Sequence, residues 1–583
     1  MQMKNMKFIA LFLILMIPWG TMAGKRQINM ADLGVTPQTP DCTPAIVKCL
    51  QECKDDKNVT ILFEKGTYHF FPDFGKDKYC FVSNNDEGLK RTIFLLEQVQ
   101  NMTIDGQGSN FIFHGFSNPF VIYDSKNVTF KNFSIDYVRP FHSEAIIIQN
   151  NPDGIDVMIP KSFPYKINNG TLVFTDGRSK EERQTTVSRE IVYPYGSLLE
   201  FDTNKRETAF MARDYYLGNT PLVAKDLGNR KVRLFLKDLR GTVGNTLVFA
   251  SANRNYPGFT VSDSENLRFE NITIFHSGGM GIVGQRTHNV TVESCKVTPS
   301  NGRMISCTAD ATHFSNCTGK IELSHCIFEN QMDDATNIHG IYVQIARQIA
   351  PNEVLVQLKH TQQLGFDFLQ KGVPVEFVQG LSLITKGNAV VLEAERINKD
   401  FTRVKLSEPL PEGIKVGDAI GELRKFPAIH IHDNYIGKNR ARGMLLNCRG
   451  KTIVENNIFH SPGAAILFEG DANFWFEQGG VNDCTIRNNV FDNCLFGVWG
   501  EAIIDVQAGI KEQRDVSRYN KNIKVYNNTF RVFDDVYLLH AYGVENMEWK
   551  NNKRVMTNDY PSVRQRDSLY KIEYCDDIKI SEP

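Results

Sequence analysis

Two short segments carry carboxylates in a pattern that suits acid–base chemistry. QMDDATNIHG (331–340) places Asp333 and Asp334 side by side, and TADATHF (308–314) places Asp310 23 residues before Asp333. In a structural repeat of that length the three carboxylates would gather on neighbouring coils, where like charges raise the pKa of at least one. Inverting glycoside hydrolysis uses a protonated acid and a base about 6.5–9.5 Å apart, with water between them. The alternative is a solvated acidic turn.

The elements that would position these residues are indicated by a recurring phrase. Examples are NLRFENITI (266–274), NVTVESCKV (289–297), KTIVENNIF (451–459) and NIKVYNNTF (522–530), each with two short alternating strands around an Asn-rich bend. The phrases starting at Asn266 and Asn289 are 23 residues apart. A period of this length with β alternation predicts a right-handed parallel β-helix, in an all-β protein. Stacked coils would let bend asparagines form a hydrogen-bonded ladder.

The phrase disappears twice, which predicts two inserted small antiparallel β-barrel or sandwich modules; long loops are the alternative. An N-terminal helix near Thr43-Pro44 is expected to cover the open end of the β-helix. The expected organisation is a signal peptide at 1–23, cap and first coils at 24–139, module 1 at 140–259, coils with the aspartates at 260–340, module 2 at 341–426 and C-terminal coils at 427–583.

The start of the chain and its charge balance limit the function classes. Lys4 and Lys7 precede a short apolar run from Phe8 to Pro18, which is typical of a secretory signal peptide rather than a membrane span. We therefore expect a periplasmic or secreted protein. Lys+Arg 66 against Asp+Glu 67 gives no reason to expect a nucleic-acid partner. The 12 cysteines lack CxxC pairs, and export would permit a disulfide among the N-terminal ones.

With these motifs in view, the chain resembles glycoside hydrolase family 110, the exo-α-1,3-galactosidases acting on blood group B-type glycans. TADATHF and QMDDATNIHG are the specific part, joined by DLGVTPQTPDCTPAI, FEKGTYHFFPD and both interruptions. The carboxylate arrangement is also similar to polygalacturonase-type β-helix hydrolases. The resemblance implies inversion without a covalent intermediate, with Asp333 as general acid. Asp310 and Asp334 would hold and deprotonate the attacking water.

The resemblance also implies an oligosaccharide substrate with a terminal α-1,3-linked galactose. A galactose site needs an apolar platform and polar partners for the hydroxyl groups. Trp475 is notable because the loop GDANFWFEQGG holds three aromatics that need a packing partner, such as a second subunit in a homodimer. The substrate-binding candidates at strand ends are Gln285, Arg286, His339, Asn447, Arg449, Glu469, Trp475 and Trp499.

Other functions are compatible with a β-helix. His430 and His432 alternate as a metal pair could, but no third ligand is evident, so we expect no metal and no cofactor. A Ca²⁺-dependent polysaccharide lyase could use Arg303 as its base, although a lyase acting on polyuronates should have a basic groove. A polygalacturonase-like hydrolase and a non-catalytic glycan-binding β-helix are the remaining alternatives.

Overall fold

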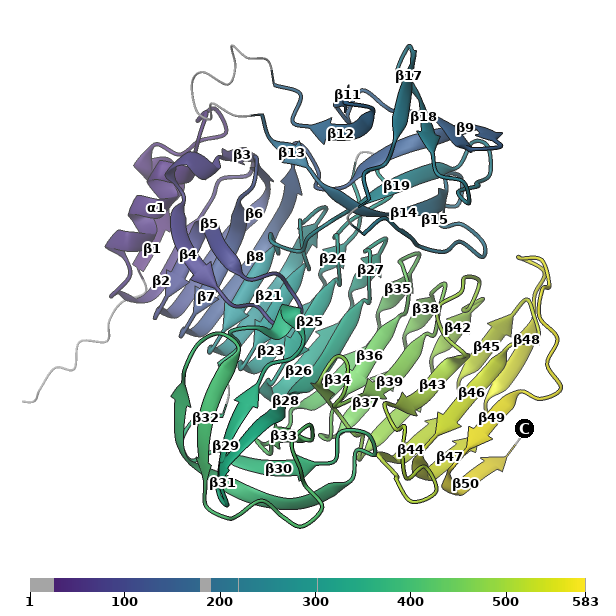
Figure 1. The fold of residues 1–583 in the computed structure, drawn as a ribbon. Coiled ribbons are helices and arrows are strands. Elements are labelled where there is room, and N and C mark those ends of the chain that lie inside the picture. Colours follow the sequence, from purple (N-terminus) through teal and green to yellow (C-terminus); the bar gives the residue numbers. More distant parts are fainter. Residues whose placement is uncertain (1–25, 179–189, 219, 301, 368, 582–583) are drawn as a thin grey trace, which may run out of the picture.

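The computed structural model describes residues 26–178, 190–218, 220–300, 302–367 and 369–581 (Figure 1). The expected signal peptide, 1–23, lies outside these residues. No helix in the described part of the chain is long and apolar enough to cross a membrane.

The body of the protein is a parallel β-helix, seen in Figure 1 as rows of arrows side by side along the molecule. One row pairs in parallel from coil to coil and consists of β2 (Lys57–Leu62), β6 (Gln100–Phe113), β8 (Lys126–Tyr137), β21 (Glu265–Ile274), β23 (His288–Glu293), β26 (Thr318–Ser324), β34 (Ala428–His432), β37 (Thr452–Glu455), β41 (Cys484–Arg487), β44 (Asn520–Tyr526), β47 (Val544–Lys550) and β50 (Asp576–Ser581). This confirms the predicted fold class.

A second row follows the Asn-rich bend of most coils. It consists of β3 (Thr67–Phe70), β24 (Lys296–Val297), β27 (Ile327–Glu329), β35 (Tyr435–Gly437), β38 (Ile458–His460), β42 (Val490–Asp492), β45 (Thr529–Val532) and β48 (Lys553–Met556). In the C-terminal coils the bend carries the predicted ladder. The Nδ2 of Asn457 donates to Asn489 Oδ1 (3.1 Å), and the Nδ2 of Asn489 donates to Asn528 Oδ1 (3.0 Å). These side chains are buried, so the ladder satisfies polar groups that water cannot reach.

A third row begins just after the turn that holds the carboxylates. Its strands are β5 (Gly88–Glu97), β7 (Asn118–Tyr123), β20 (Phe259–Ser262), β22 (Ile282–Gln285), β25 (Thr312–Ser315), β28 (Thr336–Ala350), β36 (Met444–Asn447), β39 (Ile466–Gly470), β43 (Ala502–Ala508), β46 (Tyr537–Tyr542) and β49 (Tyr570–Glu573). Neighbours in this row also pair in parallel. Every coil therefore presents the same turn position to its neighbours.

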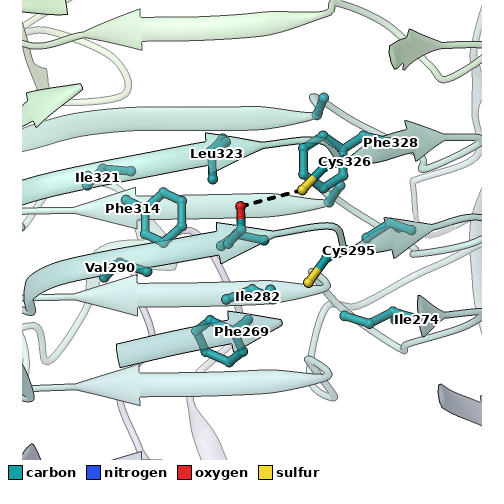
Figure 2. Packing of buried hydrophobic residues seen from close by; sticks show 14 of the residues in the cluster. Phe269, Ile274, Ile282, Val290, Cys295, Phe314, Ile321, Leu323, Cys326 and Phe328 are labelled. Atoms are coloured by element: carbon teal, nitrogen blue, oxygen red, sulfur yellow. Dashed lines mark hydrogen bonds between the residues drawn. The ribbon is translucent and has the colours of Figure 1, made fainter. Parts of the chain in front are cut away.

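The interior of the β-helix is filled by inward-pointing apolar side chains that stack from coil to coil. Phe120 stacks on Phe94 and Phe259 with ring centroids 4.4 and 4.5 Å apart. Figure 2 shows Phe269, Phe314, Cys295 and Cys326 together in this core. All twelve cysteines are free thiols, so the structure contains none of the disulfides that export would permit.

The helix α1 (Thr43–Glu52) covers the N-terminal end of the coils and buries Ile46, Cys49 and Leu50 against them. Thr43 is its first helical residue rather than its N-cap, which is Cys42. Beside it lie β1 (Arg26–Asn29), which extends the first row, and β4 (Lys76–Cys80), which pairs antiparallel with β5. The cap closes a sheet edge that would otherwise expose unpaired backbone groups.

Two antiparallel modules interrupt the coils, and Figure 1 shows them projecting from the β-helix. Module 1 consists of β9 (Ser143–Asn151), β10 (Gly154–Met158), β11 (Tyr165–Asn168), β12 (Thr171–Thr175), β13 (Val192–Tyr193), β14 (Tyr195–Asp202), β15 (Glu207–Thr208), β16 (Tyr215–Tyr216), β17 (Ala224–Gly228), β18 (Lys231–Phe235) and β19 (Thr246–Ser251). Each of its strand pairings is antiparallel.

Module 2 grows directly out of a coil, because the long strand β28 begins in the third row and ends in the module. It pairs there with β29 (Glu353–Gln357) and β33 (Ala419–Glu422), and β30 (Pro374–Val378), β31 (Thr385–Arg396) and β32 (Phe401–Leu406) complete an antiparallel sheet. The chain re-enters the β-helix at β34, which pairs with β26.

The buried asparagine ladder generates a stability prediction. Asn489→Ala removes the acceptor of the Asn457 amide and the donor to the Asn528 carbonyl oxygen. Both buried groups then lose a hydrogen bond. We expect a loss of about 1–3 kcal/mol in the free energy of unfolding, measured as a lower urea midpoint. The exposed turn residue Asn204 is the control, since Asn204→Ala should cost under about 0.5 kcal/mol. Equal midpoints for both variants would contradict a stabilising ladder.

Candidate active site

The three aspartates of the sequence motifs come together at the turn before the third row of strands. Thr312 of β25 pairs with Thr336 of β28, so Asp310 and Asp334 occupy the same position on adjacent coils. The amide of Ala311 donates to the carbonyl of Asp334 at 2.9 Å, which keeps the two turns in register. The spacing of 23 residues suggested that Asp310 aligns with Asp333, but the register places it beside Asp334 instead.

The next coil adds an arginine to this column of side chains. Thr336 pairs with Met444 of β36, which places Arg442 at the position of Asp334 one coil further on. The Nε and Nη2 of Arg442 donate to the two carboxylate oxygens of Asp334 at 2.9 and 3.0 Å. A bidentate pair of this kind fixes the carboxylate in orientation as well as position. Asp310, Asp334 and Arg442 thus form one stack across three coils.

Asp333 lies beside this stack and contacts three arginines. Its Oδ2 accepts a hydrogen bond from Arg254 Nη2 at 2.8 Å. Its Oδ1 lies 3.4 Å from both Arg440 Nη1 and Arg442 Nη2. Arg254 belongs to the segment returning from module 1, so distant parts of the chain meet at this carboxylate. The Asp333 side chain is 12% exposed, against 4% for Asp310 and 2% for Asp334.

Two buried histidines support Asp310 from the third row. The Nδ1 of His313 lies 2.8 Å from Asp310 Oδ2, and His313 Nε2 lies 2.9 Å from His339 Nε2. Burial lowers the pKa of His313 to about 4, so its imidazole is neutral at neutral pH. Glu477 lies behind the pair, with its Oε1 3.7 Å from His339 Nε2. His339 therefore contacts His313 and Glu477 rather than any of the three aspartates.

The environments of the three carboxyls push their pKa values apart. Burial raises the pKa of Asp310 well above its usual range, and the charge on Asp333 raises it further. Burial also raises the pKa of Asp334 to about 7 against the opposing pull of Arg442. Burial opposes ionisation of Asp333 too, but Arg440, Arg254 and Arg442 outweigh it and lower its pKa. Separated pKa values within one cluster are typical of acid–base catalysis.

The carboxylates line a cavity that opens to solvent and has about 460 Å³ of empty space. The lining also includes Trp475 and Glu469, whose pKa burial raises to about 7. The lining consists of Asn84, Arg254, Met280, Asp310, His313, Asp333, Asp334, Asn337, Arg442, Leu445, Glu469, Trp475 and Glu477.

The aromatic loop is explained by contacts within the chain. Both carboxylate oxygens of Asp471 accept backbone N–H bonds, including those of Phe474 (2.6 Å) and Trp475 (3.0 Å), which hold the loop in shape. The Trp475 ring packs on His360 of module 2 at 4.3 Å between centroids. Phe476 is buried, whereas Phe474 is 64% exposed. Module 2 thus supplies a packing partner for Trp475 without a second subunit.

Of the eight substrate-binding candidates, only Glu469 and Trp475 line the cavity. The side chains of the others bond to groups elsewhere in the protein. Gln285 donates to Phe81 O and Ser262 Oγ, and Arg286 pairs with Asp263. Arg449 pairs with Glu376 of module 2, and Asn447 bonds the backbone of Glu469. Trp499 donates to Asp214 beside Arg440. Strand-end position was too coarse a signal, since neighbouring positions in a strand face opposite sides.

The arginines were missed, although the sequence held a signal for two of them. The register aligns KNRARG (438–443) with NQMDDA (330–335), so Arg440 and Arg442 occupy the turn in which other coils have small residues. For Arg254 and Asn84 the periodicity offers no signal, because they lie outside the repeat. The Nδ2 of Asn84 donates to Glu477 Oε1 at 2.8 Å and ties the N-terminal region to the site.

The histidine pair of β34 gains a third neighbour that the sequence did not reveal. Glu322 of β26 lies next to His430 and His432, with ligand atoms within 4.8 Å of one another. Lys320 and Glu455 already pair with Glu322 and His430, respectively. All three residues are partly exposed and belong to the first row of strands, whereas the carboxylates precede the third. The cluster is therefore not part of the cavity.

Comparisons with known proteins find matches to both inserted modules and to nearly the whole chain. Residues 143–247 and 353–420 match the families described as GLAA-B beta-barrel domain I and GLAA-B beta-barrel domain II. The chain is 35% identical to alpha-1,3-galactosidase A of Shewanella woodyi over 93% of this chain and 88% of that one. It is 29% identical to alpha-1,3-galactosidase B of Bacteroides thetaiotaomicron over 96% and 91%. A Yersinia enterocolitica family 28 exopolygalacturonase superposes with a TM-score of 0.39 at 11% identity, covering 94% of this chain and 78% of that one.

A β-helix with clustered carboxylates and arginines at one turn, together with these relatives, defines a glycoside hydrolase. The chain belongs to the family of α-1,3-galactosidases A and B, which confirms the resemblance to glycoside hydrolase family 110.

The raised pKa of Asp310 generates a prediction about stability and pH. A folded-state pKa above the ordinary 3.8 means that the folded protein loses stability as pH rises from about 3.8 towards the raised value. Asparagine resembles the protonated aspartate without this penalty. Asp310→Asn should therefore raise the melting temperature more at about pH 8 than at about pH 5. The exposed Asp577→Asn is the control and should show no such difference. A larger gain at about pH 5 would contradict the raised pKa.

Proposed function

We propose that the protein removes terminal α-1,3-linked galactose from the non-reducing ends of glycans, with inversion at the anomeric carbon. The observation that carries the proposal is the stack of Asp310, Asp334 and Arg442 beside Asp333, in a chain whose relatives are named α-1,3-galactosidases. Water attacks the anomeric carbon while the glycosidic oxygen takes a proton and leaves with the remaining glycan. The galactose is released as the β-anomer.

The exposures of the carboxyls support a division of roles. Asp333 is the most exposed of the three and is the one that a glycosidic oxygen can reach, so it donates the proton. Asp310 and Asp334 lie deeper, on adjacent coils, and hold the attacking water and accept its proton. His313 fixes the orientation of Asp310, and Arg442 fixes that of Asp334. Because the carboxyls interact closely, their titrations belong to the cluster rather than to single residues.

The pKa values of the three carboxyls place two conditions on this assignment. Burial raises the pKa of Asp310 well above its usual range and that of Asp334 to about 7, so at least one of them must ionise before it can accept a proton from water. Arg254, Arg440 and Arg442 keep Asp333 ionised in the absence of substrate, whereas a general acid must be protonated.

The proposal therefore requires that a bound glycan draws a guanidinium away from Asp333. Arg254 suits this role, because its segment lies outside the repeat and, among the described residues, its guanidinium forms an ion pair with Asp333 alone, whereas Arg440 also pairs with Asp214 and Arg442 with Asp334. Exclusion of water by the sugar would then favour the protonated carboxyl.

The rest of the cavity suits one galactose ring. Trp475 offers an aromatic face for the apolar side of the sugar, backed by His360. Arg442, Glu469 and Asn337 offer polar atoms for the hydroxyl groups. The Oδ1 of Asn337 is buried and has no hydrogen-bond partner among the described residues, so a sugar hydroxyl can satisfy it. A terminal residue bound in this way is consistent with exo cleavage.

The competing functions receive less support. Arg303, the base expected for a lyase, is buried and donates to Asp136 at 2.5 Å. A glycan-binding protein without activity would not need three carboxyls beside three arginines. We propose further that blood group B-type glycans are substrates and that the N-terminal segment directs export to the periplasm or beyond, which would bring the enzyme to extracellular glycans.

The stereochemistry tests the mechanism directly. Digestion of a B-type trisaccharide, followed by proton NMR from the first minutes, should show β-galactose first and α-galactose only later through mutarotation. A retaining α-galactosidase of another family, run in the same buffer, provides the control spectrum. Initial release of α-galactose would contradict inversion.

The roles of the carboxyls are tested with two leaving groups. Asp333→Asn should lower kcat on the trisaccharide by about 10²–10⁴-fold, because the leaving sugar needs a proton. On 2,4-dinitrophenyl α-galactoside, whose leaving group needs none, it should retain most of its activity. Asp310→Asn and Asp334→Asn should lose activity on both substrates, since each reaction needs an activated water. The reverse pattern would assign the acid to Asp310 or Asp334, and full activity of Asp333→Asn on the glycan would contradict its catalytic role.

A further inference from the structure

Module 1 extends a segment across the coils to the edge of the candidate active site. Residues 209–217 follow β15 and contact the loop after β42. They include β16, which pairs antiparallel with β14. The amide of Met211 donates to the carbonyl of Phe496 at 2.9 Å, which anchors the segment on the β-helix. The segment carries Asp214 and Tyr216 towards Arg440, one of the three arginines around Asp333.

Four side chains form a polar and aromatic cluster at this edge, which we call the Arg440 cluster: Asp214, Tyr216, Arg440 and Trp499. The Nε and Nη2 of Arg440 donate to the carboxylate of Asp214, each at 2.9 Å, and Nη2 also donates to the Tyr216 hydroxyl at 2.9 Å. The indole N–H of Trp499 donates to Asp214 Oδ2 at 3.1 Å. The Tyr216 hydroxyl, the Trp499 indole N–H and the Asp214 carboxylate are therefore all bonded within the cluster.

The ring of Tyr216 is open to solvent, although its hydroxyl is held by Arg440. Tyr216 is 73% exposed, whereas Trp499 is partly exposed: it packs against the apolar cluster that includes Met304 and Met332, and the Arg440 guanidinium lies 5.7 Å from its ring centroid. Exposed aromatic rings whose orientation is fixed by hydrogen bonds lose little conformational entropy when they bind a ligand. Asp214 is nearly buried, with a side-chain exposure of 6%, so the anchor is rigid while the rings are available. These features are typical of a carbohydrate platform, where rings pack against the C–H face of a sugar.

The position of the cluster determines which sugar it would contact. Arg440 Nη1 lies 3.4 Å from Asp333 Oδ1, yet none of the four residues lines the cavity that holds Asp310, Asp334 and Trp475. Asp333 therefore stands between the galactose cavity and the Arg440 cluster. A proton donor contacts the glycosidic oxygen, so the groups beyond it face the sugar that leaves.

We infer that Tyr216 and Trp499, held by Asp214 and Arg440, bind the sugars on the leaving-group side of the scissile bond. The inference rests on the proposed function and adds to it that module 1 selects the glycan. A branched acceptor such as a fucosylated galactose presents a deoxy-sugar methyl group and several C–H faces to the two rings. Module 2, through His360, supports the galactose side, so each module serves one side of the bond.

The test compares two substrates that share the galactose and differ in what leaves. In Tyr216→Ala the ratio of kcat/KM for the B-type trisaccharide to kcat/KM for 4-nitrophenyl α-galactoside should fall about three- to tenfold, the size of one aromatic contact. Tyr216→Phe keeps the ring and should retain most of the ratio. The acceptor disaccharide should inhibit Tyr216→Ala more weakly than wild type by a similar factor, whereas inhibition by free galactose should not shift.

Phe235→Ala is the matched control, since Phe235 is an exposed aromatic on β18 of the same module, outside the Arg440 cluster. It should leave the ratio at the wild-type value. A wild-type ratio in Tyr216→Ala overturns the inference while α-galactosidase activity stands. Failure of the wild-type enzyme to hydrolyse either substrate would instead contradict the proposed function.

Discussion

The candidate active site depends on the register between β25, β28 and β36. Parallel strands of successive coils repeat at about 4.8 Å, so residues at one turn position are brought together whatever their separation in sequence. Asp310, Asp334 and Arg442 share such a position, and the parallel pairing of the strands that follow the turn holds their backbones in register. A shift of one residue in this register would separate Asp334 from Arg442. The remainder of the β-helix, with its stacked phenylalanines and asparagine ladder, holds the register rigid.

The three carboxyls of the site differ in the groups that lie beside them. Asp310 has a neutral histidine as its hydrogen-bonding partner, Asp334 has one bidentate arginine, and Asp333 has three arginines nearby. A buried charge is costly unless it is paired. The unequal number of arginines beside the three carboxyls therefore favours different protonation states. Acid–base chemistry needs such a difference. The arginines that pair with the buried carboxylates also lower the pKa of Asp333.

The two modules have a structural logic in common. An inserted module adds side chains beside a turn of the β-helix. The coil pairing continues across it, as β26 and β34 show on either side of module 2. Module 1 brings Asp214 and Tyr216 to Arg440, its exit segment brings Arg254, and module 2 places His360 behind Trp475. The coils supply the carboxyls, and the insertions supply many of the contacts that shape the cavity around them. Under the proposed function, the acid–base chemistry belongs to the coils and part of the glycan recognition to the inserted modules.

The sequence alone determined the period, the Asn-rich bends, the two interruptions and the aspartate motifs, because each is local and repeats with the coil. It could not determine which residues meet. Arg442 follows Asp334 only after module 2, and no period spans an insertion of that length. A period of 23 residues pairs Asp310 with Asp333, whereas this coil is one residue longer and aligns Asp310 with Asp334. Likewise, nothing in the sequence indicated that Gln285 and Arg286 are bonded to Ser262 and Asp263. Only the tertiary structure decided these points, because contacts between coils and modules depend on register and side-chain direction, which local sequence does not encode.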